Sequence, residues 1–277
     1  LDFINHTFFA YQYGASQVAH VIERVLDFLK QEDMVRQQGE RLVATPFGER
    51  ISWLYIDPKS GVTLRDGLKR AQQIQPTAFS FLHLICSTPD MELLYPRRRD
   101  YPELGIFAAE HEDEFLTHIP DEYSEPEAYE YFLAEVKTAL MLQMWIDEAP
   151  EDGIHERFGV GAGDIRRAVD TADWLLYSAQ ELAKLFKIKG VVPMLRDLRK
   201  RVRYGVKEEL LELVELRGIG RVRGRSLYRA GYRRLADIKK ADIKELAQVP
   251  HIGLEIAKSI KQQLDRGFEE AHEEIDV

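Results

Sequence analysis

The sequence predicts a mainly α-helical protein built from three successive parts, residues 1–72, 73–203 and 204–277. Apolar residues recur at helical spacing along most of the chain, and only one short segment near residue 40 has the pattern of paired strands. Two glycine-containing turns separate amphipathic helices near the C-terminus. With 45% hydrophobic and 31% charged residues among 277, the composition is that of a globular protein long enough for several domains.

The first part, residues 1–72, has the element order of a winged helix. A predicted helix over 16–30 places its apolar residues on one face. Residues 34–37 and 41–44 flank a turn and predict a β-hairpin, after which Thr45 precedes a proline as the N-cap of a further helix. No basic recognition helix is visible here, so we favour a packing role over duplex binding. The part begins with the aromatic residues Phe3, Phe8, Phe9, Tyr11 and Tyr13.

The second part, residues 73–203, is predicted to be a bundle of helices. Few of its residues favour strands, and the segments 76–85 and 126–146 have helical composition. The apolar run 141–149 ends in Asp-Glu and imitates the magnesium-binding segment of a nucleoside triphosphatase. We reject that interpretation, because the chain contains no Gly-x-x-x-x-Gly-Lys-Ser/Thr phosphate loop.

Charge is strongly segregated along the chain. The formal net charge is −9, but residues 90–152 carry 18 acidic and 4 basic side chains (−14), whereas residues 155–240 carry 21 basic and 11 acidic ones (+10). Local positive charge is what binds phosphate through counterion release. The C-terminal half is therefore the candidate nucleic-acid-binding region, although a charge run is often only a solvated helix face.

Cysteine and histidine patterns argue against an extracellular protein and against a metal site. The single cysteine, Cys86, excludes a disulfide within the chain, and there is neither a signal peptide nor a long apolar run. These features predict a cytoplasmic protein that does not contact a membrane. The eight histidines are scattered without metal-site spacing, and His111 and His118 lie among acidic residues on a predicted surface.

The predicted helix that starts at Gly163 carries a candidate contact for a single strand. At about 100° per residue, Trp174 and Arg167 share one face, away from the apolar stripe. An indole can stack on a base and a guanidinium can bind phosphate, so we predict that both, with the neighbouring Arg166, hold a single strand. The alternative that Trp174 packs against another element stays open. The glycine run 159–163 is interpreted as a flexible helix start rather than a nucleotide loop, since no hydrophobic strand precedes it.

A helix-hairpin-helix is predicted near the C-terminus. A helix over 207–216 ends at Gly218, Ile219 and Gly220, and a second helix over 221–230 follows at once. The two glycines permit a tight turn and let backbone N–H groups approach a phosphate, a contact that does not depend on base sequence. Positive charge around the turn comes from Arg221, Arg223, Arg225 and Arg229.

A second, imperfect copy of this hairpin follows. Residues 246–253 precede another amphipathic helix over 254–264, but His251 stands where the first copy has Gly218. The second copy is either a structural pseudo-repeat or a second phosphate site, and the sequence leaves both interpretations open.

Short motifs spread over almost the whole chain follow one another in a specific order. They are Ala44-Thr45-Pro46-Phe47-Gly48, Leu54-Tyr55-Ile56-Asp57-Pro58, Leu82-His83-Leu84-Ile85, Thr88-Pro89-Asp90-Met91, Phe158-Gly159-Val160-Gly161-Ala162-Gly163-Asp164, Thr171-Ala172-Asp173-Trp174-Leu175 and Leu216-Arg217-Gly218-Ile219-Gly220-Arg221-Val222-Arg223. This ordered set resembles the C-terminal portion of the archaeal Holliday-junction-migration (Hjm) helicases, relatives of the Ski-type RNA helicases and of the animal polymerase-theta-like helicase.

The resemblance implies a role for each part. It implies that the central bundle is a ratchet domain whose long helix lies along the single strand, with Trp174 stacked on a base and Arg167 on the same strand. It also implies that the hairpin domain meets the emerging 3′ tail through Arg223 and Arg225 and restrains unwinding. A family member should begin with two RecA-like motor domains, which this sequence lacks, and we favour a truncated sequence over a motorless relative.

We therefore expect the DNA-binding accessory half of an ATP-driven 3′-to-5′ helicase that unwinds forked or branched DNA in repair and recombination. The chain itself is expected to hydrolyse nothing and to hold no cofactor, with ATP and Mg²⁺ confined to the motor domains. Expected partners are single-stranded and forked DNA, those motor domains, and replication or repair proteins. Two alternatives stay open, namely an RNA-helicase cassette with the same parts and a scaffold whose acidic stretch, 90–152, docks a basic partner.

Overall fold

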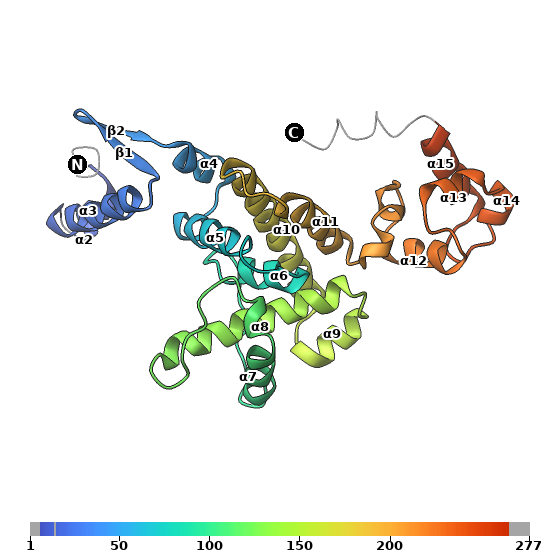
Figure 1. Ribbon diagram of the computed structural model, residues 1–277, viewed down its shortest axis with the longest axis horizontal. Helices are drawn as coiled ribbons and strands as arrows, with labels where there is room; N and C mark the ends of the chain where they lie inside the picture. Colours follow the sequence, from blue (N-terminus) through green and yellow to red (C-terminus); the bar gives the residue numbers. More distant parts are fainter. Residues whose placement is uncertain (1–5, 14, 266–277) are drawn as a thin grey trace.

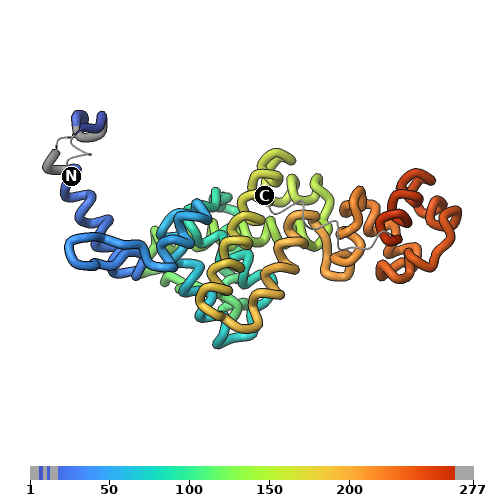
Figure 2. The backbone as a smooth tube through the Cα atoms, turned by 90° about the horizontal axis from the view of Figure 1, so that it is seen from above, coloured from blue at the N-terminus to red at the C-terminus, as the bar shows by residue number. Residues whose placement is uncertain are grey.

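The computed structural model describes residues 6–13 and 15–265 and is an elongated series of helices with one two-stranded hairpin (Figure 1). The N-terminal elements lie at one end, a helical bundle occupies the middle, and a compact group of short helices lies at the other end (Figure 2). The predicted mainly α fold class is confirmed. Phe3 and residues 266–277, which belong to the predicted first and third parts, lie outside the described residues.

The elements follow sequence order along the molecule. The N-terminal ones are α2 (Phe8–Tyr13), α3 (Ala15–Gln31), β1 (Val35–Gln38), β2 (Arg41–Ala44), α4 (Pro46–Leu54) and α5 (Pro58–Arg70). The bundle continues with α6 (Ala78–Cys86), α7 (Tyr101–Glu110), η1 (Glu112–Glu114), α8 (Pro126–Ile146), α9 (Glu151–Phe158), α10 (Ala162–Leu185) and α11 (Val191–Tyr204). The last group is η2 (Glu208–Leu210), η3 (Leu213–Glu215), α12 (Arg221–Arg229), α13 (Leu235–Lys240), α14 (Ile243–Leu246) and α15 (Leu254–Asp265).

The predicted β-hairpin and the helix cap after it are both present. β1 pairs with β2 antiparallel, from Val35 opposite Ala44 to Gln38 opposite Arg41. Thr45 then caps α4, because its Oγ1 accepts a hydrogen bond from the backbone N–H of Gly48 at 3.1 Å. The same hydroxyl donates to the carbonyl oxygen of Asp33 at 2.5 Å, which ties the hairpin to the start of the helix.

One apolar core extends from Met34 to Val202 and joins α4 and α5 to the bundle. The long helix α10 packs along α11 and also contacts α4, α5 and α6, while α8 packs against α6, α7 and α9. Because α10 is central to these contacts, its direction determines where its exposed face lies. The described residues contain no helix long and apolar enough to cross a membrane.

A second, separate core extends from Val206 to Leu264 and holds the C-terminal group together. The prediction of an α-helix over 207–216 is wrong, because this segment forms two 3₁₀ turns, η2 and η3. A segment this short is not stable as an isolated helix, so packing decides its conformation. Both turns lie against α12, where a Cβ on Gly224 would stand 3.4 Å from Val214. The helices predicted over 221–230 and 254–264 are present as α12 and α15.

The sequence pattern did not indicate the buried polar pair that His83 and Glu135 form in the bundle. His83 on α6 is fully enclosed by aromatic rings, and its Nε2 lies 3.5 Å from a carboxylate oxygen of Glu135 on α8. Burial lowers the pKa of His83 to about 3. Burial also raises the pKa of Glu135 to about 7, although a hydrogen bond from Ser87 opposes that rise. At neutral pH the imidazole is therefore uncharged, and the pKa of the Glu135 carboxyl lies well above its ordinary value.

The raised pKa of Glu135 predicts a pH-dependent difference in stability between wild type and Glu135→Gln. A folded-state pKa of about 7, above the ordinary value of 4.5, means that wild type loses stability as pH rises through 7. The variant lacks this loss, so its stability relative to wild type should increase by roughly 2 kcal/mol between pH 5 and pH 8. The contribution of His83 is lost as pH falls from about 6.5 toward 3 and is common to both proteins. Denaturant unfolding at several pH values measures the difference, with the exposed Glu127→Gln as control, and parallel pH profiles would contradict it.

Candidate nucleic-acid interface

The start of α10 is built by the glycine run that precedes it. Gly161 is the N-cap residue, and its backbone N–H donates to a carboxylate oxygen of Asp164 at 2.9 Å. That backbone hydrogen bond, followed by the ion pair with Arg167, holds the pKa of Asp164 below its usual value. The glycine run thus hydrogen-bonds to the first turn of α10, in agreement with its interpretation as a helix start. Within the described residues, no group of three or more His, Cys, Asp or Glu is arranged to hold a metal ion.

Arg166 and Arg167 lie on the exposed surface of α10, each beside a carboxylate of the same helix. Arg166 pairs with Asp170 at 2.9 Å, and Arg167 pairs with Asp164 at 2.5 Å. All four side chains are about half to two-thirds exposed, so these ion pairs contribute little to stability and are easily exchanged. Both guanidinium groups are accessible to a phosphate.

Trp174 lies on the same helix but is half-buried against the core. Its indole N–H donates to the carbonyl oxygen of Leu54 at 2.9 Å, so the ring closes the C-terminal end of α4. The structure therefore gives Trp174 a packing contact as well as a partly accessible surface. Two exposed aromatic side chains flank this contact, Trp53 (80% exposed) and Tyr55 (87% exposed), and sequence reasoning missed both as candidates.

Two arginines of α11 lie against α10. Arg199 and Arg203 both pair with Asp173, at 3.0 Å each, and the guanidinium of Arg199 lies 4.7 Å from the ring centre of Tyr177. A side chain that the sequence left unassigned, Asp173, thus gathers two arginines next to the candidate strand contact. Its position immediately before Trp174 was the available signal.

The first glycine hairpin is open to its surroundings. Gly218 has a left-handed φ of 82°, and a Cβ on either Gly218 or Gly220 would meet no atom within 4 Å. Ile219 between them is buried in the C-terminal core and anchors the turn. The backbone around Gly218 and Gly220 is therefore approachable by a ligand.

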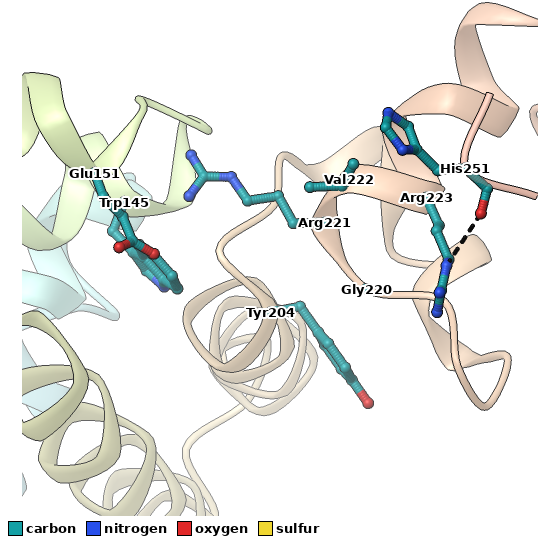
Figure 3. A pocket seen from close by; sticks show the side chains of 8 residues that line it. All are labelled: Trp145, Glu151, Tyr204, Gly220, Arg221, Val222, Arg223 and His251. Carbon is teal, nitrogen blue, oxygen red and sulfur yellow. Dashed lines mark hydrogen bonds between the residues drawn. The ribbon is translucent and has the colours of Figure 1, made fainter. Parts of the chain in front are cut away.

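The second hairpin has the same backbone conformation and lies beside the first. His251, in the place of Gly218, also takes a left-handed φ, of 67°. Arg223 connects the two turns, since it donates to the carbonyl oxygen of Gly218 at 2.7 Å. It also donates to the carbonyl oxygen of His251 at 3.2 Å (Figure 3). The sequence repeat thus corresponds to a structural repeat.

Two further arginines of the first hairpin, Arg221 and Arg225, contact the bundle. Arg225 makes two hydrogen bonds with Glu148, at 2.7 and 2.5 Å, and one with Glu209 at 2.9 Å, and the bond with Glu148 holds the pKa of Arg225 above its usual value. Arg221 donates to the carbonyl oxygen of Ala149, and its guanidinium lies 4.9 Å from the ring centre of Trp145. Burial lowers the pKa of Arg221. Both side chains join the C-terminal group to the end of α8.

The ion pair between Arg225 and Glu148 should stabilise the attachment of the C-terminal group. Their side chains are 19% and 12% exposed, whereas Arg166 and Asp170 are 70% and 57% exposed. We expect Arg225→Ala to lower the free energy of unfolding of residues 206–265 by roughly 1–3 kcal/mol, because Glu148 is left without its main partner. Hydrogen exchange of that segment measures the loss. Arg166→Ala is the matched control and should change it little, and equal effects of the two variants would argue against the attachment.

Comparison with known proteins relates these features to a family. Residues 79–205 match the family described as archaeal helicase, domain 4, and residues 210–266 match the SAM-like helix-hairpin-helix tandem.

Among curated proteins, the chain is similar to ATP-dependent DNA helicases named Hel308. Identity is 43% with the protein of Methanocella arvoryzae, over 95% of this chain and 36% of the relative. It is 42% with that of Thermococcus kodakarensis, over 95% and 24%, and 38% with that of Pyrococcus horikoshii, over 96% and 37%. The chain thus spans only about a quarter to a third of these relatives. The matches show that the chain is related, over nearly its whole length, to the C-terminal part of archaeal superfamily-two helicases, the family that its ordered motifs predicted.

Proposed function

We propose that the chain is the single-strand DNA-binding accessory half of an ATP-dependent 3′-to-5′ helicase that unwinds forked or branched DNA in repair and recombination. The observation that carries this proposal is the open hairpin at Gly218 and Gly220, placed at one end of a bundle whose long helix exposes Arg166 and Arg167. Backbone N–H groups and arginines bind phosphate without regard to base sequence, as a translocating enzyme requires. The relatives' printed name, ATP-dependent DNA helicase, supports the same conclusion.

The division of labour in the complete protein follows from this proposal. The chain holds and guides the strand, while ATP and Mg²⁺ bind to RecA-like motor domains, which are also its partners within the full-length protein. Single-stranded DNA contacts α10 through Arg167 and the accessible part of Trp174, and the 3′ tail contacts the hairpin and Arg223. Arg225 serves the junction with the bundle in the DNA-free state. Replication or repair proteins are further proposed partners.

The direct test is a fluorescence-anisotropy titration of a 3′-tailed DNA fork at two salt concentrations. Binding that weakens with salt, and that is stronger for DNA than for the RNA strand of the same sequence, supports the proposal. Equal or stronger binding of RNA would favour an RNA-helicase cassette. Absence of binding at both salt concentrations would leave the scaffold interpretation.

Substitution of Trp174 separates its stacking role from its packing role. Trp174→Ala should weaken single-strand binding by roughly 1–3 kcal/mol, the range for one base–aromatic stack. Trp174→Phe keeps a ring but loses the hydrogen bond to Leu54, so it should lose less strand affinity while still losing thermal stability. Affinity and melting temperature are measured on both variants. A loss of stability in both without any loss of affinity would mean that Trp174 only packs.

Removal of both exposed arginines of α10 should weaken binding through charge alone. The double variant Arg166→Ala/Arg167→Ala should bind every single-stranded sequence more weakly. The negative slope of log affinity against log salt should become shallower by about 1.4, which is about 0.7 for each lost phosphate contact. The control is Arg36→Ala, an exposed arginine on β1 that is likewise paired with a neighbouring aspartate. An unchanged salt slope in the double variant would place the strand elsewhere.

A further inference from the structure

A cavity of about 490 Å³ lies between the bundle and the hairpin group (Figure 3). Trp145 and Glu151 line it from the bundle, Tyr204 lines it from the end of α11, and Arg221 and Arg223 line it from the hairpin. Its volume falls in the range of sites that hold small organic ligands. It is bounded by the same hairpin that the proposed function assigns to DNA.

The bundle side of the cavity is held in a fixed geometry. The indole N–H of Trp145 donates to the carbonyl oxygen of Val202 at 2.7 Å. Gly205 lies so close to the indole that a Cβ there would be 2.6 Å from a ring atom, so only glycine fits. Arg221 covers part of the same ring. A ligand in the cavity would therefore meet a bundle wall at Trp145 that need not rearrange, which lowers the cost of binding.

Planar groups and charges are divided between the two sides. The phenol of Tyr204 and the guanidinium of Arg221 are flat surfaces of the kind on which bases stack. Arg223 supplies positive charge on the hairpin side, whereas the carboxylate of Glu151 stands on the bundle side. Because a carboxylate repels phosphate, a nucleotide should place its phosphate near Arg223 and its base toward Glu151.

Glu151 is an open hydrogen-bond acceptor. Among the residues that the structure describes, its side chain makes neither an ion pair nor a hydrogen bond, and it lies exposed at the start of α9. Its charge acts on Arg221, since burial lowers the pKa of that guanidinium while Glu148 and Glu151 oppose the lowering. A carboxylate accepts hydrogen bonds from exocyclic amino groups, as it does from the amino group of cytosine. Thymine has no such group and offers only carbonyl oxygens at that position.

We propose that this cavity holds one nucleotide of the bound single strand and selects bases that carry an exocyclic amino group through Glu151. The inference rests on the proposed function, since the strand must first be bound by the hairpin and α10. Contacts to the phosphates alone would give no base preference, so a preference that depends on Glu151 is specific to the cavity.

The test compares oligo(dC) and oligo(dT) of equal length in fluorescence-anisotropy titrations with the chain. Both are weakly stacking pyrimidine strands, and cytosine carries an amino group where thymine carries a carbonyl oxygen. Wild type should bind oligo(dC) about five- to tenfold more tightly, the lower end of the range for one specific base contact. Glu151→Ala should bring the affinity ratio close to one, and Glu151→Gln, which keeps an acceptor oxygen, should retain part of it. Asp152→Ala removes the same charge one residue away and should leave the ratio unchanged.

The outcomes separate this inference from the function on which it rests. Equal binding of the two strands by wild type, or a preference that survives Glu151→Ala, overturns the cavity proposal and leaves single-strand binding intact. Failure of wild type to bind either strand overturns the proposed function, and the cavity proposal with it. Melting temperatures of the variants show that the affinity ratios are compared between folded proteins.

Discussion

The ion pair between Arg225 and Glu148 is the interaction on which the arrangement of the two halves depends. The two apolar cores share no residue, and the chain passes between them through a short segment around Gly205. Contacts at the end of α8, together with the ion pair between Lys200 on α11 and Glu215 in η3, therefore orient the C-terminal group. Arg225 binds Glu148, Arg221 lies over Trp145, and the backbone N–H of Lys207 also donates to Glu148 at 3.0 Å. These contacts therefore determine the position of the hairpin relative to α10.

This constraint divides the arginines of the proposed interface into two classes. Arg166 and Arg167 are paired with carboxylates in exposed positions, where water already competes for both partners. A phosphate can take the place of the Asp164 or Asp170 carboxylate as the partner of the arginine without changing the fold. Arg225 is largely enclosed, and separating it from Glu148 would leave a carboxylate without its main partner. All of these arginines carry the same charge, so the two classes are distinguished by burial alone.

The sequence predicted the local structure well because its signals are local. Helical periodicity, the turn at Gly39 and the Thr45 cap located the hairpin and the helices around it. Helix geometry placed Arg167 and Trp174 on one face away from the core, where Arg167 is exposed but Trp174 is half-buried against the core. The hydrogen bond from Trp174 to Leu54 joins residues 120 positions apart, so no pattern within α10 could show it. The failure at 207–216 has a related cause, since packing against α12 overrode helical composition.

The two copies of the hairpin share a left-handed backbone residue but differ in the cost of that conformation. Gly218 adopts a left-handed φ without cost, whereas His251 adopts it at a cost of about 1–2 kcal/mol. Arg223 donates to the carbonyl oxygens of both residues, so the strained turn holds an arginine beside the relaxed one. The second hairpin can therefore support the first by positioning Arg223, without binding phosphate itself. Its contribution to a phosphate site would be to hold the Arg223 guanidinium next to Gly218. Gly218 itself could not supply a side chain for this purpose, because its left-handed backbone would be strained by one.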